Sequence, residues 1–435
     1  MTELAPYPEY KDSGVEWLGE TPSHWGRAQL RRVATIVNGG TPTPDEAHWG
    51  GSVAWATPVD LNTFDGHTIE STLRTLTIEG LASGSALVPS GSVILSTRAP
   101  IGYSAMTRSP VAFNQGCKGL IPTGDVDSRF MLVAVQAAKA ELARRGQGTT
   151  FLELSSSALG SVDVPLPPCD EQLAIADFVE RETVEIDAFI ADQEELIGLL
   201  TERRAATITH AVTKGLDPSA PMKDSGIEWL GVVPERWLVN RLSRCVRINE
   251  GQVDPKRMPF AEMILIAPNH VEAKTGRSGS FESAAAQGAE SGKYLVRSGQ
   301  VIYSKIRPGL AKVILAPFDC LCSADMYGLD ARRDDELDNR FLRWLMLSQP
   351  FTDYAIDQSA RVAMPKLNQE TLGAAPVWYA SIDEQRYIAD YLDRETAELD
   401  AAVADAREAI ALLKERRAAL ISAAVTGKID VRELA

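Results

Sequence analysis

With 435 residues, the chain is too long for one ordinary hydrophobic core, and two or three domains are expected. It is 45% hydrophobic and 24% charged, as in a globular protein, and no run of 18 or more apolar residues predicts a membrane span. No signal segment opens the chain, and the five cysteines are scattered and odd in number. We therefore expect a cytoplasmic protein with reduced thiols.

The net charge of −15 is unevenly distributed. Residues 169–217 hold 4 Lys+Arg against 12 Asp+Glu, and residues 376–435 hold 8 against 12. Residues 21–168 hold 11 of each, and residues 234–375 hold 19 against 17. The negative charge thus lies mainly in residues 169–217 and 376–435. Residues 21–168 and 234–375 can present local basic surfaces to nucleic acid although the net charge of the chain is negative.

A lead-in, residues 1–20, opens the chain. Its segment K-D-S-G-V-E-W-L-G (Lys11–Gly19) returns at Lys223–Gly231 with eight of nine residues identical. This second copy lies in another lead-in, residues 218–233. The tryptophans Trp17 and Trp25, and their counterparts Trp229 and Trp237, could be stacking platforms for bases. Because both copies keep them beside prolines, packing of the lead-in against the following insert is the favoured interpretation.

Insert 1, residues 21–168, contains short β-like runs separated by glycine and proline. L-V-P-S-G-S-V-I-L-S (Leu87–Ser96) predicts a turn followed by a buried strand, and a helix is predicted near Ser128–Arg144. A mixed α/β domain follows. Basic and polar residues gather after these elements and are candidate DNA contacts, because such side chains bind phosphates and base edges: Arg98, Tyr103, Arg108, Lys118, Arg144, Arg145, Gln147 and Thr149.

Residues 169–217 predict one long helix. Asp170 follows a proline-rich stop and is a plausible N-cap, and Gly215 is a plausible C-terminal stop. Apolar residues recur at helical spacing along one face for about 40 residues, a length of about 60 Å.

Insert 2, residues 234–375, differs from insert 1 over most of its length but repeats the turn and strand as L-V-R-S-G-Q-V-I-Y-S (Leu295–Ser304). A helix is predicted near Asn339–Gln358, so both inserts should share an α/β (α+β) fold. Its candidate DNA contacts follow the same elements: Lys305, Arg307, Lys312, Gln358, Arg361 and Lys366.

Residues 376–435 predict a second long helix. Asp383–Asp430 repeats Asp170–Asp217 with 28 of 48 residues unchanged, including the apolar face. Because helix 1 leads directly into the second lead-in, helix 2 must return toward insert 1. An antiparallel intramolecular coiled coil with pseudo-two-fold symmetry is therefore predicted; the alternative is two separate helices, each packed on its own insert. The predicted helix-pair interface comprises Ile175, Val179, Ile186, Ile190, Ile197, Ile388, Leu392, Leu399, Val403 and Ile410.

Motifs for catalysis are missing from the sequence. G-A-E-S-G-K-Y at Gly288–Tyr294 is one residue short of a phosphate-binding loop and has tyrosine in place of Ser/Thr. The cysteines and five histidines lack metal-ligand spacing, and neither a nucleophile elbow nor an amino-methyltransferase motif occurs. We expect neither a catalytic residue nor a metal site.

The order of motifs resembles one family. A lead-in K-D-S-G-x-E-W-L-G-x-x-P-x-x-W, an insert, a proline-rich stop, D-E-Q-x-x-I-A-D-[FY] and a long helix with E-R-R-A-A occur twice. This arrangement resembles the specificity subunit (S subunit) of type I restriction–modification systems, from about Tyr7 to Asp430. The corresponding residues are Trp17, Pro22 and Trp25 with Trp229, Pro234 and Trp237, and Glu171-Gln172 with Glu384-Gln385.

The resemblance implies that each insert is a target-recognition domain that reads one half of a two-part sequence in double-stranded DNA. The helices would set the gap and dock two adenine methyltransferase (modification) subunits, and restriction/translocase subunits would join them. S-adenosylmethionine, ATP and Mg²⁺ would act only in these partners. Two rivals remain from the residues alone: a coiled-coil scaffold with two protein- or ligand-binding modules, and an enzyme with an unrecognised site in the inserts.

Overall fold

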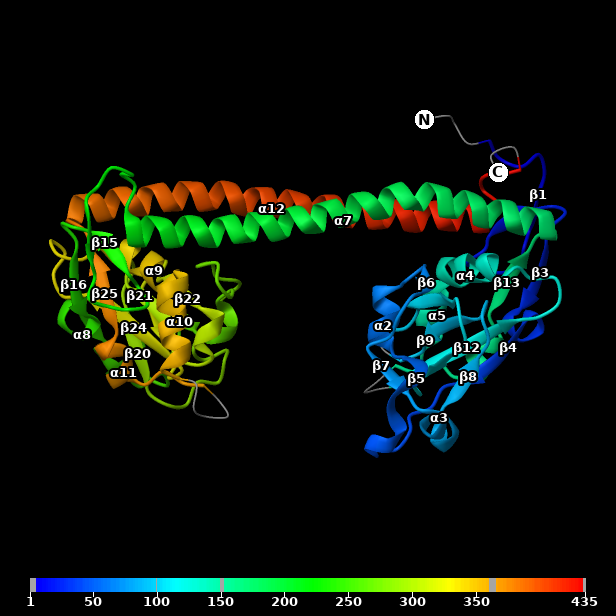
Figure 1. Cartoon of the computed structure of the whole chain (residues 1–435), viewed down its shortest axis with the longest axis horizontal. Helices are drawn as coiled ribbons and strands as arrows, with labels where there is room; N and C mark the ends of the chain where they lie inside the picture. Colours follow the sequence, from blue (N-terminus) through cyan, green and yellow to red (C-terminus); the bar gives the residue numbers. More distant parts are fainter. Residues whose placement is uncertain (1–4, 99, 149–151, 360–364, 433–435) are drawn as a thin grey trace. The chain divides into compact units, whose positions relative to one another are not determined.

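The computed structural model describes residues 5–98, 100–148, 152–359 and 365–432. The chain forms two compact units: unit 1 is Met1–Gln193 with Glu408–Ala435, and unit 2 is Glu194–Arg407. Each unit therefore holds one lead-in, one insert and one half of each long helix (Figure 1). Of the helices within the described ranges, none is long and apolar enough to span a membrane.

In unit 1 the lead-in is a β-hairpin, and the insert contains two sheets with orders β4-β12-β9-β10-β6 and β7-β5-β11-β8. β13 pairs antiparallel with β3, which returns the end of the insert to its start just before the long helix. The strands are β1 (Tyr10–Asp12), β2 (Glu20–Pro22), β3 (Gly26–Gln29), β4 (Ala34–Asn38), β5 (Trp49–Ala56), β6 (Thr68–Ile69), β7 (Arg74–Leu76), β8 (Ala86–Val88), β9 (Val93–Ser96), β10 (Ser104–Thr107), β11 (Val111–Phe113), β12 (Cys117–Pro122) and β13 (Asp163–Leu166). The short helices are α1 (Leu30–Val33), η1 (Glu46–His48), α2 (Pro58–Thr63), α3 (Ile78–Gly84), α4 (Ser128–Ala137), α5 (Lys139–Arg144) and α6 (Ser156–Gly160).

Unit 2 repeats this plan with two four-stranded sheets, β17-β24-β21-β22 and β18-β20-β23-β19, and with β25 paired to β16. Its strands are β14 (Met222–Asp224), β15 (Val232–Pro234), β16 (Leu238–Arg241), β17 (Val246–Ile248), β18 (Gln252–Val253), β19 (Leu265–Ile266), β20 (Lys293–Val296), β21 (Val301–Ser304), β22 (Val313–Leu315), β23 (Cys320–Cys322), β24 (Met326–Ala331) and β25 (Pro376–Tyr379). Its short helices are α8 (Leu242–Cys245), η2 (Pro268–His270), η3 (Pro308–Leu310), α9 (Asn339–Leu347), α10 (Gln349–Asp357) and α11 (Gln369–Ala374).

The two long helices are α7 (Cys169–Lys214) and α12 (Ile382–Val425). α7 begins one residue before the predicted cap Asp170, because the amide of Gln172 already donates to the carbonyl of Pro168. Gly215 and Gly427 follow the helix ends with φ of +74° and +73°, the left-handed conformation that glycine adopts readily.

The single helices predicted in the inserts are each two helices. In insert 1 the break lies at Ala138, between α4 and α5. In insert 2 it lies at Ser348, which has extended backbone and precedes a proline in the first turn of α10. Proline cannot donate its amide to a preceding turn, so a new helix starts there.

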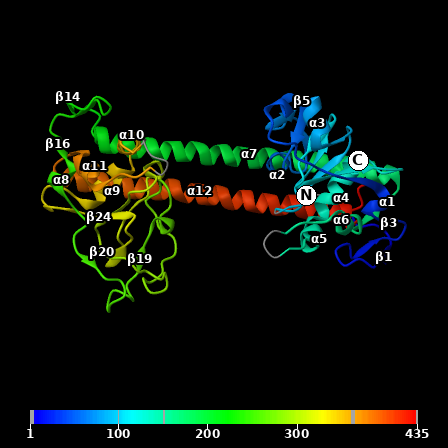
Figure 2. The same cartoon turned by 90° about the horizontal axis from the view of Figure 1, so that it is seen from below.

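The helices run antiparallel in each unit, where they lie side by side in both views (Figure 1 and Figure 2). In unit 1, Ile175 and Val179 share a buried cluster with Ile421 and Val425; in unit 2, Ile208 and Val212 share one with Ile388 and Leu392. Both clusters also contain insert residues, so the apolar face packs on the partner helix and on the insert together. Of the predicted interface residues, six are buried and four are half-buried (Ile190, Ile197, Val403 and Ile410).

The motifs shared by the two copies attach each insert to the start of its long helix. The Nε1 of Trp25 donates to Glu171 at 2.8 Å, and that of Trp237 donates to Glu384 at 3.0 Å. The neighbouring glutamine is buried in both units: Gln172 bonds to residues 125, 127 and 167 of insert 1. Gln385 does the same with residues 336, 338 and 380. These contacts fix the position of each insert relative to the first turn of the long helix that follows it.

Residues near the two ends of the chain, within the described ranges, meet in unit 1. The amide of Asp430 donates to the carbonyl of Ala5 at 2.8 Å, and the hydroxyl of Tyr10 donates to the carbonyl of Gly427 at 2.8 Å. This proximity follows from the antiparallel connectivity, because α12 returns the chain to unit 1.

Candidate nucleic-acid interface

In insert 1, a polar cluster forms where Gln147 and residues 153–156 lie beside the end of β9. The backbones of Gln147 and Glu153 exchange hydrogen bonds, and Arg98 forms an isolated β-bridge with Glu153. The Nε of Arg98 lies 3.3 Å from a carboxylate oxygen of Glu153, and both side chains are about half exposed. We call Asn38, Arg98, Lys118, Gln147 and Glu153 cluster 1.

Lys118 of cluster 1 lies on β12, and burial lowers the pKa of its ammonium group, with the neighbouring Glu153 opposing that shift. Its Nζ donates to Oδ1 of Asn38 at 2.9 Å. This bond leaves Arg98 as the more accessible cation of the cluster. The exposed carboxylate of Glu153 beside it could accept a hydrogen bond from the N4 amino group of cytosine, as Arg98 could donate to guanine.

Insert 2 builds a corresponding cluster after β21. The amide of Leu367 donates to the carbonyl of Lys305, and that of Arg307 donates to Pro365, while Ile306 bridges Lys366. We call Lys305, Arg307 and Lys366 cluster 2. In the part of the chain that the structure describes, none of these three cations has an ion-pair partner. A surface with three uncompensated charges favours an anionic partner such as a phosphate backbone.

Arg307 in cluster 2 has left-handed backbone, with φ of +48°, and Ala311 four residues later has φ of +40°. Each such residue costs about 1–3 kcal/mol when it carries a side chain. Strained residues of this kind concentrate at functional sites, and their position beside three cations supports a binding role for this turn.

The other predicted contacts do not join these clusters. The ring of Tyr103 lies under Nζ of Lys139, and Arg108 pairs with Glu70 at 3.4 Å. Glu141 takes hydrogen bonds from both Arg144 and Arg145, and Arg145 also donates to Ser161. In insert 2, Lys312 donates to the carbonyl of Pro268 and Gln358 to Asp357. Thr149 and Arg361 lie outside the described residues.

Sequence reasoning missed several residues of insert 1. Asn38 and Glu153 complete cluster 1, but Asn38 lies 80 positions from Lys118 and Glu153 lies 55 positions from Arg98, so the sequence did not show that they are neighbours. A second feature is the guanidinium of Arg74, 3.4 Å from the ring centre of Trp49. The H-W-G-G-S-V-A-W segment, with its two aromatic residues, was the available signal. Within the described residues, no group of three or more His, Cys, Asp or Glu could hold a metal ion.

Comparison with known proteins agrees with this architecture. The family described as "Type I restriction modification DNA specificity domain" matches residues 22–192 and 276–405. The first match covers insert 1 and the first half of α7, and the second covers the later part of insert 2 and the first half of α12. The chain belongs to this family. The predicted fold class is thereby confirmed: two recognition domains of the type I specificity family joined by a pair of long antiparallel helices.

Relatives of this specificity-domain protein carry related names. It is 27% identical to the type I restriction enzyme EcoDI specificity subunit of Escherichia coli, over 71% of each chain. It is also 27% identical to the MjaIX specificity subunit of Methanocaldococcus jannaschii, over 58% of each. A chain from a solved type I R-M system superposes with a TM-score of 0.66 at 17% identity, covering 93% of this chain and 98% of that one.

Proposed function

We propose that the chain is the DNA-sequence-specificity subunit of a type I restriction–modification complex. Each insert reads one half of a two-part target in double-stranded DNA, and the helices set the gap between the halves. The observation that carries this proposal is the duplication itself: two family domains with different inserts on one repeated frame. An asymmetric two-part sequence is the ligand that such a protein fits.

Clusters 1 and 2 are the proposed reading surfaces. They occupy corresponding places after β9 and β21 but differ in charge, since cluster 1 contains a carboxylate and cluster 2 does not. Different donors and acceptors at one place in a shared fold select different bases, whereas the cations hold the phosphates.

The helices are the proposed docking surface for two methyltransferase subunits. Val184 and Phe189 of α7 are 61% and 60% exposed, and Leu199 is 55% exposed. Large apolar side chains that are exposed on a helix can be buried by a partner protein, which favours a protein over DNA as the ligand of the helices. The acidity of the helices agrees, because it would repel phosphates. Methyl transfer, cleavage and their S-adenosylmethionine, ATP and Mg²⁺ would belong to these partners, and restriction subunits would join them in the cytoplasm.

The test is methylation mapping of DNA from cells that express the chain with its methyltransferase. We expect one two-part motif with methylated adenine in each half. Arg98→Ala should relax one half and Lys305→Ala the other. Salt-insensitive or absent binding of duplex DNA by the purified complex would refute the proposal in favour of a protein- or ligand-binding scaffold. Methylation or cleavage by the purified chain alone would refute the non-catalytic role.

A further inference from the structure

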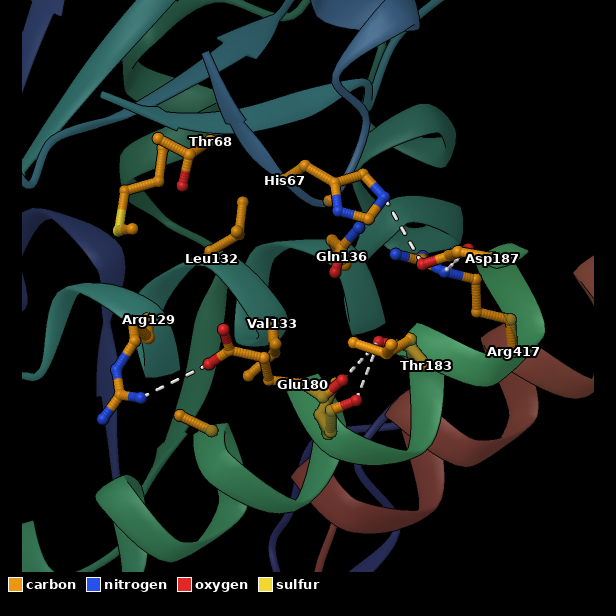
Figure 3. Close-up of a pocket in the computed structure, with 15 residues that line it drawn as sticks. His67, Thr68, Arg129, Leu132, Val133, Gln136, Glu180, Thr183, Asp187 and Arg417 are labelled. Carbon is orange, nitrogen blue, oxygen red and sulfur yellow. Dashed lines mark hydrogen bonds and ion pairs between the residues drawn. The ribbon is translucent and has the colours of Figure 1, made fainter. Parts of the chain in front are cut away.

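In unit 1, an ion pair joins the two long helices beneath a loop of insert 1 (Figure 3). The Nε of Arg417 on α12 lies 2.9 Å from Oδ1 of Asp187 on α7, and the side chains are only 15% and 26% exposed. His67 of the loop after α2 approaches the other oxygen of Asp187 at 3.4 Å. Gly66 lies so close that a Cβ there would be 2.6 Å from the Arg417 guanidinium.

Unit 2 contains the same arrangement with the helices exchanged. The Nε of Arg204 on α7 donates to Oδ1 of Asp400 on α12 at 3.0 Å. The other nitrogens of Arg204 donate to the carbonyls of Lys274 and Thr275, in the loop after η2. η2 and α2 occupy the same place in the two inserts, since each follows a strand and starts with proline. Burial lowers the pKa of Arg204 and Asp400 opposes this shift, so the carboxylate stabilises the buried guanidinium charge.

The two ion pairs are consistent with one and the same alignment of α7 against α12. The residue numbers of each facing pair, 187 with 417 and 204 with 400, add to 604. Asp187 and Asp400 are equivalent in the repeat, as are Arg204 and Arg417 of the E-R-R-A-A motifs. Asp187 and Arg204 are 17 positions apart on one helix and cannot pair there. Only the antiparallel crossing brings each arginine to the aspartate of the other copy.

This register is specified by charge as well as by apolar packing. A slip of seven residues keeps an apolar face in phase, so the apolar stripe alone resists it weakly. In either direction, however, that slip would set Asp187 against Ile410 or Ala424 and Asp400 against Ile197 or Ala211. A largely buried carboxylate that loses its partner is strongly disfavoured, and fixing register is the best attested use of such groups.

We propose that the Asp187–Arg417 and Arg204–Asp400 ion pairs form a register lock. They fix which residues of α7 and α12 face each other, and each pair holds the insert of its own unit at that position along the helices. All four are positioning residues for the gap between half-sites. The consequence for DNA rests on the proposed function. The register itself does not, because it is a property of the helices within each unit.

The test uses Asp187→Asn with Asp400→Asn, which keep size but remove charge. The matched control is Asp192→Asn with Asp405→Asn, equivalent exposed residues of the same helices that have no ion-pair partner within the described ranges. The first readout is methylation of DNA series whose half-sites are separated by the native gap or by one base pair more or less. The second is oxidative cross-linking of Ile190→Cys to Lys414→Cys, which line one cavity of unit 1 and also sum to 604. Cys169→Ser removes the exposed native thiol.

We expect the preference of the lock variant for the native gap over the other gaps to fall about fivefold. A change of this size lies within the range of interaction energies between coupled residues. The lock variant should also form less cross-link than the control. The half-site bases should stay the same. Unchanged gap preference and cross-linking in a folded lock variant would overturn the proposal. So would a uniform loss of methylation at all gaps with normal cross-linking, which indicates mere destabilisation. If the parent complex shows no gap-dependent methylation, the proposed function fails, and cross-linking alone decides the lock.

Discussion

The contact between Glu171 and the lead-in predicts a difference in stability between the two units. Glu171 is buried, and one carboxylate oxygen accepts hydrogen bonds from the indole of Trp25 at 2.8 Å and the hydroxyl of Tyr7 at 3.0 Å. Burial, and after it the charge of Glu171, raises the pKa of Tyr7, so the phenol stays a donor. His24 adds a third contact at 2.7 Å but is 40% exposed and can be hydrated instead.

Glu171→Ala would leave two buried donors without an acceptor. Each such donor costs about 1–3 kcal/mol, so unit 1 should lose about 2–6 kcal/mol of its free energy of unfolding. In the equivalent Glu384→Ala, the indole of Trp237 is the only donor among the described residues that loses its acceptor, and unit 2 should lose about 1–3 kcal/mol. A typical total is about 5–15 kcal/mol, so the first change should open the start of unit 1 measurably.

Hydrogen exchange read by mass spectrometry separates the two effects. Glu171→Ala should speed exchange in residues 5–30 and 169–183 and leave residues 218–240 unchanged; Glu384→Ala should do the reverse, more weakly. Glu185→Ala, an exposed position on α7, should change neither, within about 0.5 kcal/mol. Equal effects of the two substitutions, or a larger effect in unit 2, would refute the reasoning from counted donors.

Three further outcomes are expected. A four-residue insertion after Ala191, matched at the equivalent place in α12, adds about 6 Å and should lengthen the recognised gap by about two base pairs; methylation mapping that finds the old gap would contradict this. Arg98→Ala should lower the salt dependence of binding to one half-site by about one counterion, whereas Arg145→Ala, whose partners are internal, should leave it unchanged in a salt titration. Hydrogen bonds, first of all from Arg144, lower the pKa of Glu141. The contribution of this carboxylate to stability is therefore present above its unfolded pKa and is lost as the pH falls through its folded pKa. The thermal unfolding temperature of Glu141→Gln should fall less on acidification than that of the parent chain.

Local signals were enough for the helices. The spacing of Ile175, Val179 and Ile186 predicted one buried face, and Gly215 predicted the end of the first helix, because side-chain direction and left-handed backbone are local properties. The breaks at Ala138 and Ser348 were missed, since an apolar helical pattern can continue through a change of axis.

The surfaces that we propose to read DNA could be predicted only in part. Recurrence after equivalent strands found Arg98, Lys305 and Lys366, which the structure gathers into clusters. The same reasoning selected Arg145, whose contacts are with Glu141 and Ser161. A basic residue in a loop carries no mark of whether its charge is neutralised within the protein, because that depends on neighbours far away in the sequence.

The repeat in the sequence was by itself sufficient to determine the frame, its antiparallel sense and the existence of two different readers, since those follow from periodicity and chain order. Only the tertiary structure decided which carboxylate each arginine meets. Asp187 pairs with Arg417 and Arg204 with Asp400, across more than 190 positions. The pairing of charges is a matter of distance in space, and that distance exists only once the two helices and the insert have packed together.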